Sequence, residues 1–291
     1  MSTGNTVGIT HVEHPMYSSN RDSAAAGPLW RYTARFLLRK YKNSVCRVQL
    51  IVTSFNFSDI RVTWLLYPLQ GLNVFFTRRN YGTIAAENYA WYALYFAIAA
   101  LLYFVFVWPA VLFLCSLVFG PGVVLFGLVH AALHVNLWTM QWLRGSCRST
   151  HRRLAVRMSR VENFPPLMYP ISSDQYVDTL HPSNVRHLGF WVNDLPWMVA
   201  KSLLLVVWAL FKCLLSLVPI VGLFAVAALE APSTGWEYCD ALRPGIGFYE
   251  DYARYLLLGL GCTALDMIPV LSGLTFTTNT IACGIMMKDE Y

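Results

Sequence analysis

The sequence predicts an all-α integral membrane protein: a two-span helical hairpin followed by two long apolar segments that Pro and Gly interrupt. Of its 291 residues, 56% are hydrophobic and only 13% are charged, whereas about a quarter of the residues of a soluble domain are charged. From Asn88 to Leu143 there is no Asp, Glu, Lys or Arg. Because one membrane span needs roughly 20 apolar residues, this stretch is long enough for two spans and the turn between them.

The N-terminal part differs in composition from the rest of the chain. Residues 1–28 are rich in Ser, Thr, Gly and Asn and predict a disordered tail. Residues 29–60 form a basic region, in which arginines recur every fourth position; its basic candidates are Arg31, Arg35, Arg39, Lys40 and Lys42. This spacing is typical of an amphipathic helix that lies on an anionic membrane surface, and it also fits an ordinary exposed helix. Residues 61–291 are then the predicted helical membrane domain.

The two predicted spans run from Trp91 to Val118 and from Val123 to Leu143. Pro109 predicts a kink in the first span, and Gly-Pro-Gly at 120–122 predicts a tight turn between them. The apolar run at 64–76 is too short to cross and predicts an interfacial or re-entrant element.

Charge predicts the orientation of these spans. Up to Arg160 the chain has 16 basic and 4 acidic residues, and from Val161 onward it has 6 and 12. Basic residues gather in short cytoplasmic loops, and the second span is followed at once by a run of arginines that begins at Arg144. We therefore expect that loop and both chain termini to be cytoplasmic.

Two later segments, Trp197 to Leu229 and Arg254 to Met287, share a pattern. Each is apolar and is broken near its middle, at Pro219 and Gly222 in one and at Pro269 and Gly273 in the other. Pro removes a backbone hydrogen bond, and Gly permits a reversal. The pattern fits either two kinked spans or two re-entrant hairpins. Glu230 to Asp251, between the segments, is predicted to be a loop of mixed charge.

Several short motifs occur over about residues 60–286: YPLQG at 67–71, VPIVG at 218–222, FY at 248–249 with Tyr252 and Arg254, LDMIPVL at 265–271 and IACG at 281–284. In their order and spacing they resemble the etoposide-induced-protein/CysZ-like membrane family, especially its fungal outer-spore-wall and lipid-droplet relatives. At 77–80 the chain has TRRN where fungal relatives tend to have a His-Pro pair. The resemblance implies paired spans with half-membrane hairpins. It also implies either sulfate uptake, as in the bacterial branch, or a lipid-droplet and spore-wall role, as in the fungal branch.

Lys212 and Asp266 are the ionisable residues inside the two broken segments. Because a charge inside a membrane usually faces the protein interior and has a partner, one hypothesis is a Lys212–Asp266 ion pair that lines a polar cavity. The alternative is that Lys212 reaches the interface while Asp266 caps the half-helix that begins near Pro269. Free N–H groups at such half-helix starts also offer an anion or lipid-headgroup site.

Other candidate chemistry is sparse. His130 and His134 share one face of the second span, and the interpretation that needs least is hydrogen bonding between helices, since no further metal-binding pattern accompanies them. The seven cysteines form no Cys-x-x-Cys pair and predict neither a disulfide framework nor a metal site. No nucleophile or nucleotide-binding motif occurs, so we expect no catalytic residues, no cofactor and no enzyme activity.

Three functions fit this sequence. The first is a multi-pass membrane organiser or accessory factor of the endoplasmic reticulum or of lipid droplets, with a spore-wall-type or lipid-linked role. The second is a small-solute or anion transporter, and the third is a non-catalytic membrane accessory of a lipid or secondary-metabolite pathway. The partners that we expect are a lipid bilayer or monolayer, anionic lipid headgroups and a second copy of the chain, but no nucleic acid.

Overall fold

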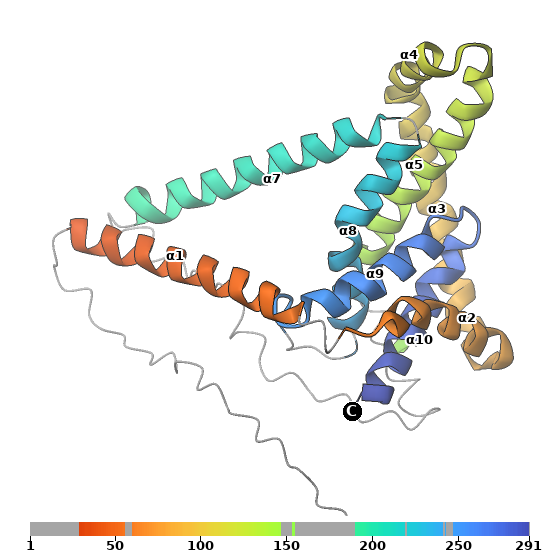
Figure 1. Cartoon of the computed structure of the whole chain (residues 1–291). Helices are drawn as coiled ribbons and strands as arrows, with labels where there is room; N and C mark the ends of the chain where they lie inside the picture. Colours follow the sequence, from red (N-terminus) through yellow and green to blue (C-terminus); the bar gives the residue numbers. More distant parts are fainter. Residues whose placement is uncertain are drawn as a thin grey trace, which may run out of the picture.

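The computed structural model describes residues 29–55, 60–146, 153–154, 190–218, 220–240, 242 and 247–290, and over these residues it is all-helical (Figure 1). This confirms the predicted fold class. The predicted disordered tail at 1–28, most of the connector that precedes residue 190, and Pro219 lie outside the described residues. The α-helices are α1 (Leu29–Ser54), α2 (Tyr67–Thr77), α3 (Gly82–Phe106), α4 (Trp108–Phe119), α5 (Val123–Ser146), α7 (Leu195–Ser216), α8 (Val221–Asp240), α9 (Tyr252–Asp266) and α10 (Ser272–Glu290).

The predicted two-span hairpin is formed by α3 and α4 on one side and α5 on the other. The first side begins at Gly82 and not at Trp91, and it is interrupted at Val107, two residues before Pro109. Proline is tolerated in the first turn of α4, where no helical N–H bond is needed. Gly120, with φ of 51°, turns the chain at the tip; this backbone conformation is easy only for glycine.

Both broken segments reverse direction and are therefore hairpins, not kinked spans. In a continuous helix, Lys212 and Glu230 would be about 27 Å apart, but their Nζ and Oε1 atoms are 2.7 Å apart. In the second segment the side chain of Asn279 donates to the carboxylate of Asp266 at 2.9 Å. The residues that follow the two prolines in the sequence, Ile220 and Val270, have φ of 60° and 75°. A β-branched residue is rarely found in this conformation, so packing must hold both reversals in place.

The region predicted to be a mixed-charge loop, Glu230 to Asp251, is helical over its first half. α8 continues to Asp240 with Pro232 inside it. Pro, Ser, Thr and Gly at 232–235 resemble a loop by composition, but Pro232, Thr234 and Gly235 are all buried. Packing against neighbouring helices therefore outweighs local propensity here.

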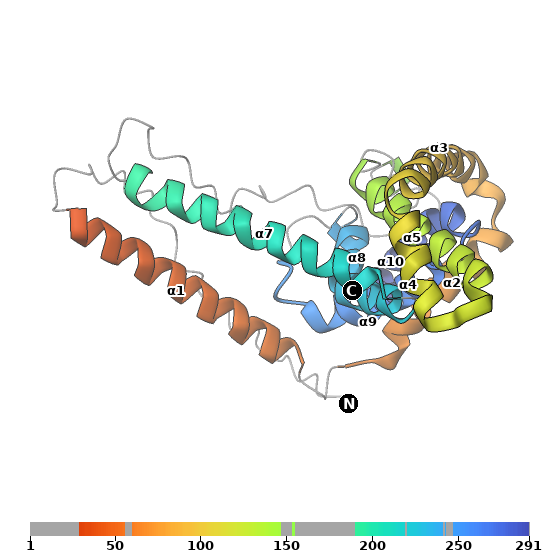
Figure 2. The same ribbon diagram turned by 90° about the horizontal axis from the view of Figure 1, so that it is seen from above.

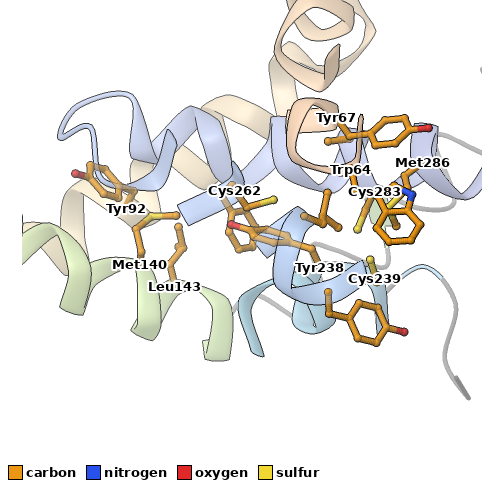
Figure 3. Packing of buried hydrophobic residues seen from close by; sticks show 14 residues of the cluster. Trp64, Tyr67, Tyr92, Met140, Leu143, Tyr238, Cys239, Cys262, Cys283 and Met286 are labelled. Atoms are coloured by element: carbon orange, nitrogen blue, oxygen red, sulfur yellow. The ribbon is translucent and has the colours of Figure 1, made fainter. Parts of the chain in front are cut away.

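The core of the molecule is formed by α8, α9 and α10 together with α2, and α3 and α5 lie along it. Its buried side chains are mainly aromatic and sulfur-containing, among them Tyr238, Phe276, Cys262 and Met286 (Figure 3). α8 and α9 approach so closely that a Cβ at Gly259 would overlap the carbonyl oxygen of Ala231. A Cβ at Gly235 would likewise overlap the carbonyl oxygen of Tyr255. Small residues that allow such close backbones are typical of helix pairs in membranes.

α1 and α7 project away from this core as two long helices (Figures 1 and 2). Their N-terminal ends meet, where the Phe36 and Trp197 rings lie 6.3 Å apart and Asn193 donates to Thr33 at 3.2 Å. The other end of α1 reaches the start of α9, where the Ala253 N–H donates to the Ser54 hydroxyl at 3.3 Å. We name α1 and α7 together the arm.

Three described helical segments are long and apolar enough to cross a membrane: Gly82–Phe106, Val123–Ser146 and Phe190–Ser216. The third comprises α7 and the single π-helical turn before it, and none of its most apolar stretch is buried in the protein. An apolar helix that the protein itself leaves uncovered needs lipid or another chain around it.

Candidate functional site

The centre of the polar interior is Asp266, the last residue of α9. Only 4% of it is exposed, and four side chains from three helices surround its carboxylate. Arg144 Nη1 lies 3.3 Å and the Tyr238 hydroxyl 3.2 Å from Oδ2, while Thr275 Oγ1 at 2.5 Å and Asn279 Nδ2 at 2.9 Å donate to Oδ1. We name these five residues the Asp266 cluster. It joins α5, α8, α9 and α10 through one buried charge.

α5 contacts both helix reversals through polar side chains. The Nδ1 of His130 accepts a hydrogen bond from the N–H of Ile220, at 3.2 Å. Six residues further on, Asn136 donates to the carbonyl oxygen of Asp266 at 2.6 Å and accepts from the Tyr92 hydroxyl at 2.8 Å. Ser272 also donates to that carbonyl, at 2.8 Å. Backbone groups that the two reversals would leave without partners are therefore satisfied by side chains, as a membrane interior requires.

Beside the Asp266 cluster lies a polar cavity of about 230 Å³ that opens to one side. We name it the charged cavity; it is lined by Gln141, Arg144, Lys212, Glu230, Ser233 and Glu237. Arg144 Nε donates to Glu237 at 3.1 Å, and Lys212 donates to Glu230, which also accepts from the Gln141 amide. Two cations and two carboxylates thus line one space, and Arg144 connects this space to Asp266.

The hypothesis of a Lys212–Asp266 ion pair is wrong. Lys212 pairs with Glu230 and Asp266 pairs with Arg144, because α7 folds back along α8 while the end of α9 faces α5. The cavity that the pair was expected to line does exist, but Lys212 and not Asp266 lines it. Asp266 instead contacts α10 through the side chains of Thr275 and Asn279, whereas the predicted cap would accept from backbone N–H groups.

The helix-break residues have steric roles where the structure describes them. A Cβ at Gly222 would overlap the carbonyl oxygen of Leu215, and one at Gly273 would press against the rings of Tyr89 and Tyr92. Pro269 lies in the turn between α9 and α10, whereas Pro219 lies outside the described residues. The tight reversals therefore need glycine at 222 and 273.

The two histidines of α5 are brought together, with ring centroids 5.5 Å apart. His134 packs edge-on against Tyr103 and Trp138, at 5.2 and 4.9 Å. Among the residues with described positions, no group of His, Cys, Asp or Glu has an arrangement that could hold a metal ion. His130 accepts from the backbone of Ile220, which lies in the turn before α8 and not in a helix, and among the described residues neither ring nitrogen of His134 has a hydrogen-bond partner, so hydrogen bonding between helices stays a prediction for this pair.

The basic residues of α1 do not all face outward. Arg31, Arg35, Arg39 and Lys42 are exposed, but Lys40 is only 9% exposed, and its Nζ lies 5.6 Å from the Trp197 ring and 5.7 Å from the Phe36 ring. Counting Lys40 as a membrane-surface residue was therefore wrong, because the folded arm places it between α1 and α7.

Sequence reasoning missed most of this site. Arg144 was assigned to the basic loop, and Glu230 and Glu237 to the mixed-charge loop. One signal was available: Glu230, Ser233 and Glu237 are spaced i, i+3 and i+7, the spacing of one helical face. The partners of Asp266 carried no such signal, since they are 9 to 122 residues away in sequence.

The fold and the site define a helical membrane protein with reversed helical hairpins and a buried ionic centre. In comparison with known proteins, the chain is similar to the outer spore wall protein LDS1 of Saccharomyces cerevisiae, with 20% identity over 275 residues that cover 90% of this chain and 82% of the relative. No family model matches the chain, and no solved structure matches it. The similarity supports a distant relationship to that spore wall protein, and the broader CysZ-like resemblance remains an expectation from sequence.

Proposed function

We propose that the chain is a non-catalytic membrane organiser of the endoplasmic reticulum or of lipid droplets, and that it acts in a spore-wall-type or lipid-linked process. The observation that carries the proposal is the arm. Two long helices project from the core and expose apolar and basic side chains that the core itself does not need.

The exposed side chains of α1 are arranged as a membrane-surface helix requires. Leu38, Tyr41, Val45, Val48 and Val52, spaced alternately by three and four residues, are all exposed, so they form one apolar stripe along the helix. Arg39 and Lys42 each directly follow a residue of this stripe, and Arg35 lies one helical turn before Leu38. Apolar side chains beside basic ones suit the boundary between acyl chains and anionic headgroups.

α7 supplies the more apolar half of the arm. Its exposed residues include Leu203, Leu204, Val207 and Leu214, each at least 60% exposed. Burial of such side chains in lipid contributes about 1.5–3 kcal/mol each, so insertion of α7 is strongly favoured. The name of the yeast relative, an outer spore wall protein, supports a role in building a cell-surface layer from a membrane.

The proposal is tested by neutralising the exposed basic residues of α1. In the triple variant Arg35→Gln, Arg39→Gln, Lys42→Gln we expect the fluorescently tagged full-length chain to stay in membranes through α3, α5 and α7 but to lose its enrichment in the endoplasmic reticulum or at lipid droplets. Each basic residue near an anionic surface contributes about 1 kcal/mol to binding. Loss of three such residues should therefore lower the affinity of α1 for an anionic membrane surface about a hundredfold. The matched control, Arg35→Lys with Arg39→Lys, keeps the charge and should localise as wild type. An unchanged distribution of the triple variant would contradict the proposal.

Transport is the second candidate, and the charged cavity favours it. Its two cations and two carboxylates balance, which supports a dipolar solute better than sulfate or another anion. If the chain is a transporter, Lys212→Ala should abolish flux into vesicles while leaving the distribution in cells unchanged. An organiser should work normally with that variant.

A further inference from the structure

We propose that the charged cavity binds the headgroup of a phosphoethanolamine lipid, whose acyl chains lie along α7. This inference requires only that the chain is embedded in lipid. It does not depend on the organising role proposed above, because it makes no use of the basic residues of α1.

The charges around the cavity select a zwitterion. Arg144 and Lys212 supply two positive charges to the lining, and Glu230 and Glu237 supply two negative ones; behind the lining, the carboxylate of Asp266 lies 3.3 Å from Arg144 and adds a further negative charge. A net anion would gain from the cations but would be repelled by the carboxylates, and a net cation would meet the reverse. A group with separated phosphate and ammonium charges satisfies both kinds of side chain.

The charged cavity is half open to its surroundings, with Ser233 exposed, but two of its four charged side chains are largely buried. The side chains of Arg144 and Glu230 are 7% and 12% exposed, whereas those of Lys212 and Glu237, 27% and 38% exposed, lie nearer the opening. Arg144 is held by Asp266, and Glu230 is held by Gln141, so these two less exposed side chains are fixed in place. The two more exposed side chains are therefore the ones that a ligand would meet first, one of each sign.

The lining favours ethanolamine over choline. A primary ammonium has three N–H donors for carboxylates, and Glu230 and Glu237 supply carboxylate oxygens. A quaternary ammonium has no such donors and is usually held by aromatic rings. Of the six residues that line the cavity none is aromatic, so the preference between two lipids of equal charge should be measurable.

The neighbouring surface indicates a lipid and not a free headgroup. Leu205 and Trp208 precede Lys212 by seven and four residues and so lie on its face of α7, and they are 60% and 44% exposed. A cavity of about 230 Å³ is smaller than those that enclose a drug-sized molecule, which begin at roughly 300 Å³. It therefore suits a headgroup, while acyl chains remain outside against the apolar side chains of α7.

Native mass spectrometry of the full-length, delipidated chain in detergent tests this proposal. The probes are phosphatidylethanolamine, phosphatidylcholine and phosphatidylglycerol with identical acyl chains, and soluble glycerophosphoethanolamine. Loss of the ammonium N–H bonds to carboxylates should weaken binding about tenfold. We therefore expect phosphatidylethanolamine to bind about tenfold more tightly than phosphatidylcholine, with phosphatidylglycerol weaker still and the soluble headgroup undetected.

Two variants locate the binding. Ser233→Phe fills the cavity without removing a charge and should abolish the preference for phosphatidylethanolamine. Its control Ser202→Phe, on an exposed position of α7 outside the cavity lining, should keep the preference. Glu237→Gln retains an acceptor for Arg144 but removes one carboxylate, so it should lower the preference for ethanolamine over choline and strengthen binding of phosphatidylglycerol.

Three results would overturn the inference: equal binding of ethanolamine and choline lipids, an unchanged preference in Glu237→Gln, or a soluble headgroup that binds as tightly as the lipid. If Ser233→Phe does not fold, Glu237→Gln tests the inference by itself, because Gln has about the same size as Glu and keeps an oxygen that accepts from Arg144.

Discussion

At the level of single residues, one buried carboxylate connects the helices of the core. Asp266 receives four side-chain contacts, and among the described residues Arg144 forms its ion pair. A charge in an apolar interior is tolerated only when it is paired and fully hydrogen-bonded. The guanidinium of Arg144 contacts both Asp266 and Glu237, so Arg144 links the Asp266 cluster to the charged cavity.

Substitution of Asp266 should therefore be far more damaging than loss of an exposed carboxylate. Removal of one partner from a buried ion pair costs about 3–5 kcal/mol, and Asp266→Ala also removes the carboxylate to which Thr275 and Asn279 donate. Glu87→Ala breaks an exposed pair with Arg153 and should cost at most about 1 kcal/mol. Heating in detergent followed by fluorescence-detected size-exclusion chromatography compares the two variants. Equal stability would show that the Asp266 cluster is not a structural centre.

At the element scale, the reversals and the glycine contacts determine how the hairpins pack. α8 and α9 pack closely because Ala231 and Gly235 face Tyr255 and Gly259. This packing positions Tyr238 against Asp266 and turns Glu230 and Glu237 toward α5 and α7. The site therefore depends on two glycines that do not line it.

A methyl group added at the α8–α9 contact should separate these helices. Because overpacking costs about 1–3 kcal/mol, Gly259→Ala should lower the thermal midpoint in detergent. In the control Gly145→Ala the new methyl group meets nothing within 4 Å, so this variant should be neutral or slightly stabilising. Circular dichroism melting distinguishes them, and a midpoint of Gly259→Ala equal to that of wild type would refute the close contact.

At the scale of the whole molecule, the sequence predicts what is local and misses what depends on the relation between hairpins. The Pro109 interruption and the Gly-Pro-Gly turn follow from local backbone chemistry, whereas the Pro and Gly breaks at 218–222 and 268–273 fit a kink as well as the reversal that packing selects. The partners of Lys212 and Asp266 depend on which helix each reversal packs against, and no local pattern contains that information. Lys40 shows the same limit, since its burial arises only when Trp197 of α7 lies beside α1.

Lipid, not water, surrounds the exposed apolar helices of this protein. Extraction of cell membranes with alkaline carbonate, without detergent, tests this claim most directly. Exposed apolar residues on α3, α5 and α7 predict that the full-length chain stays in the membrane pellet and leaves it only when detergent is added. Release of the chain into the carbonate supernatant would contradict the account.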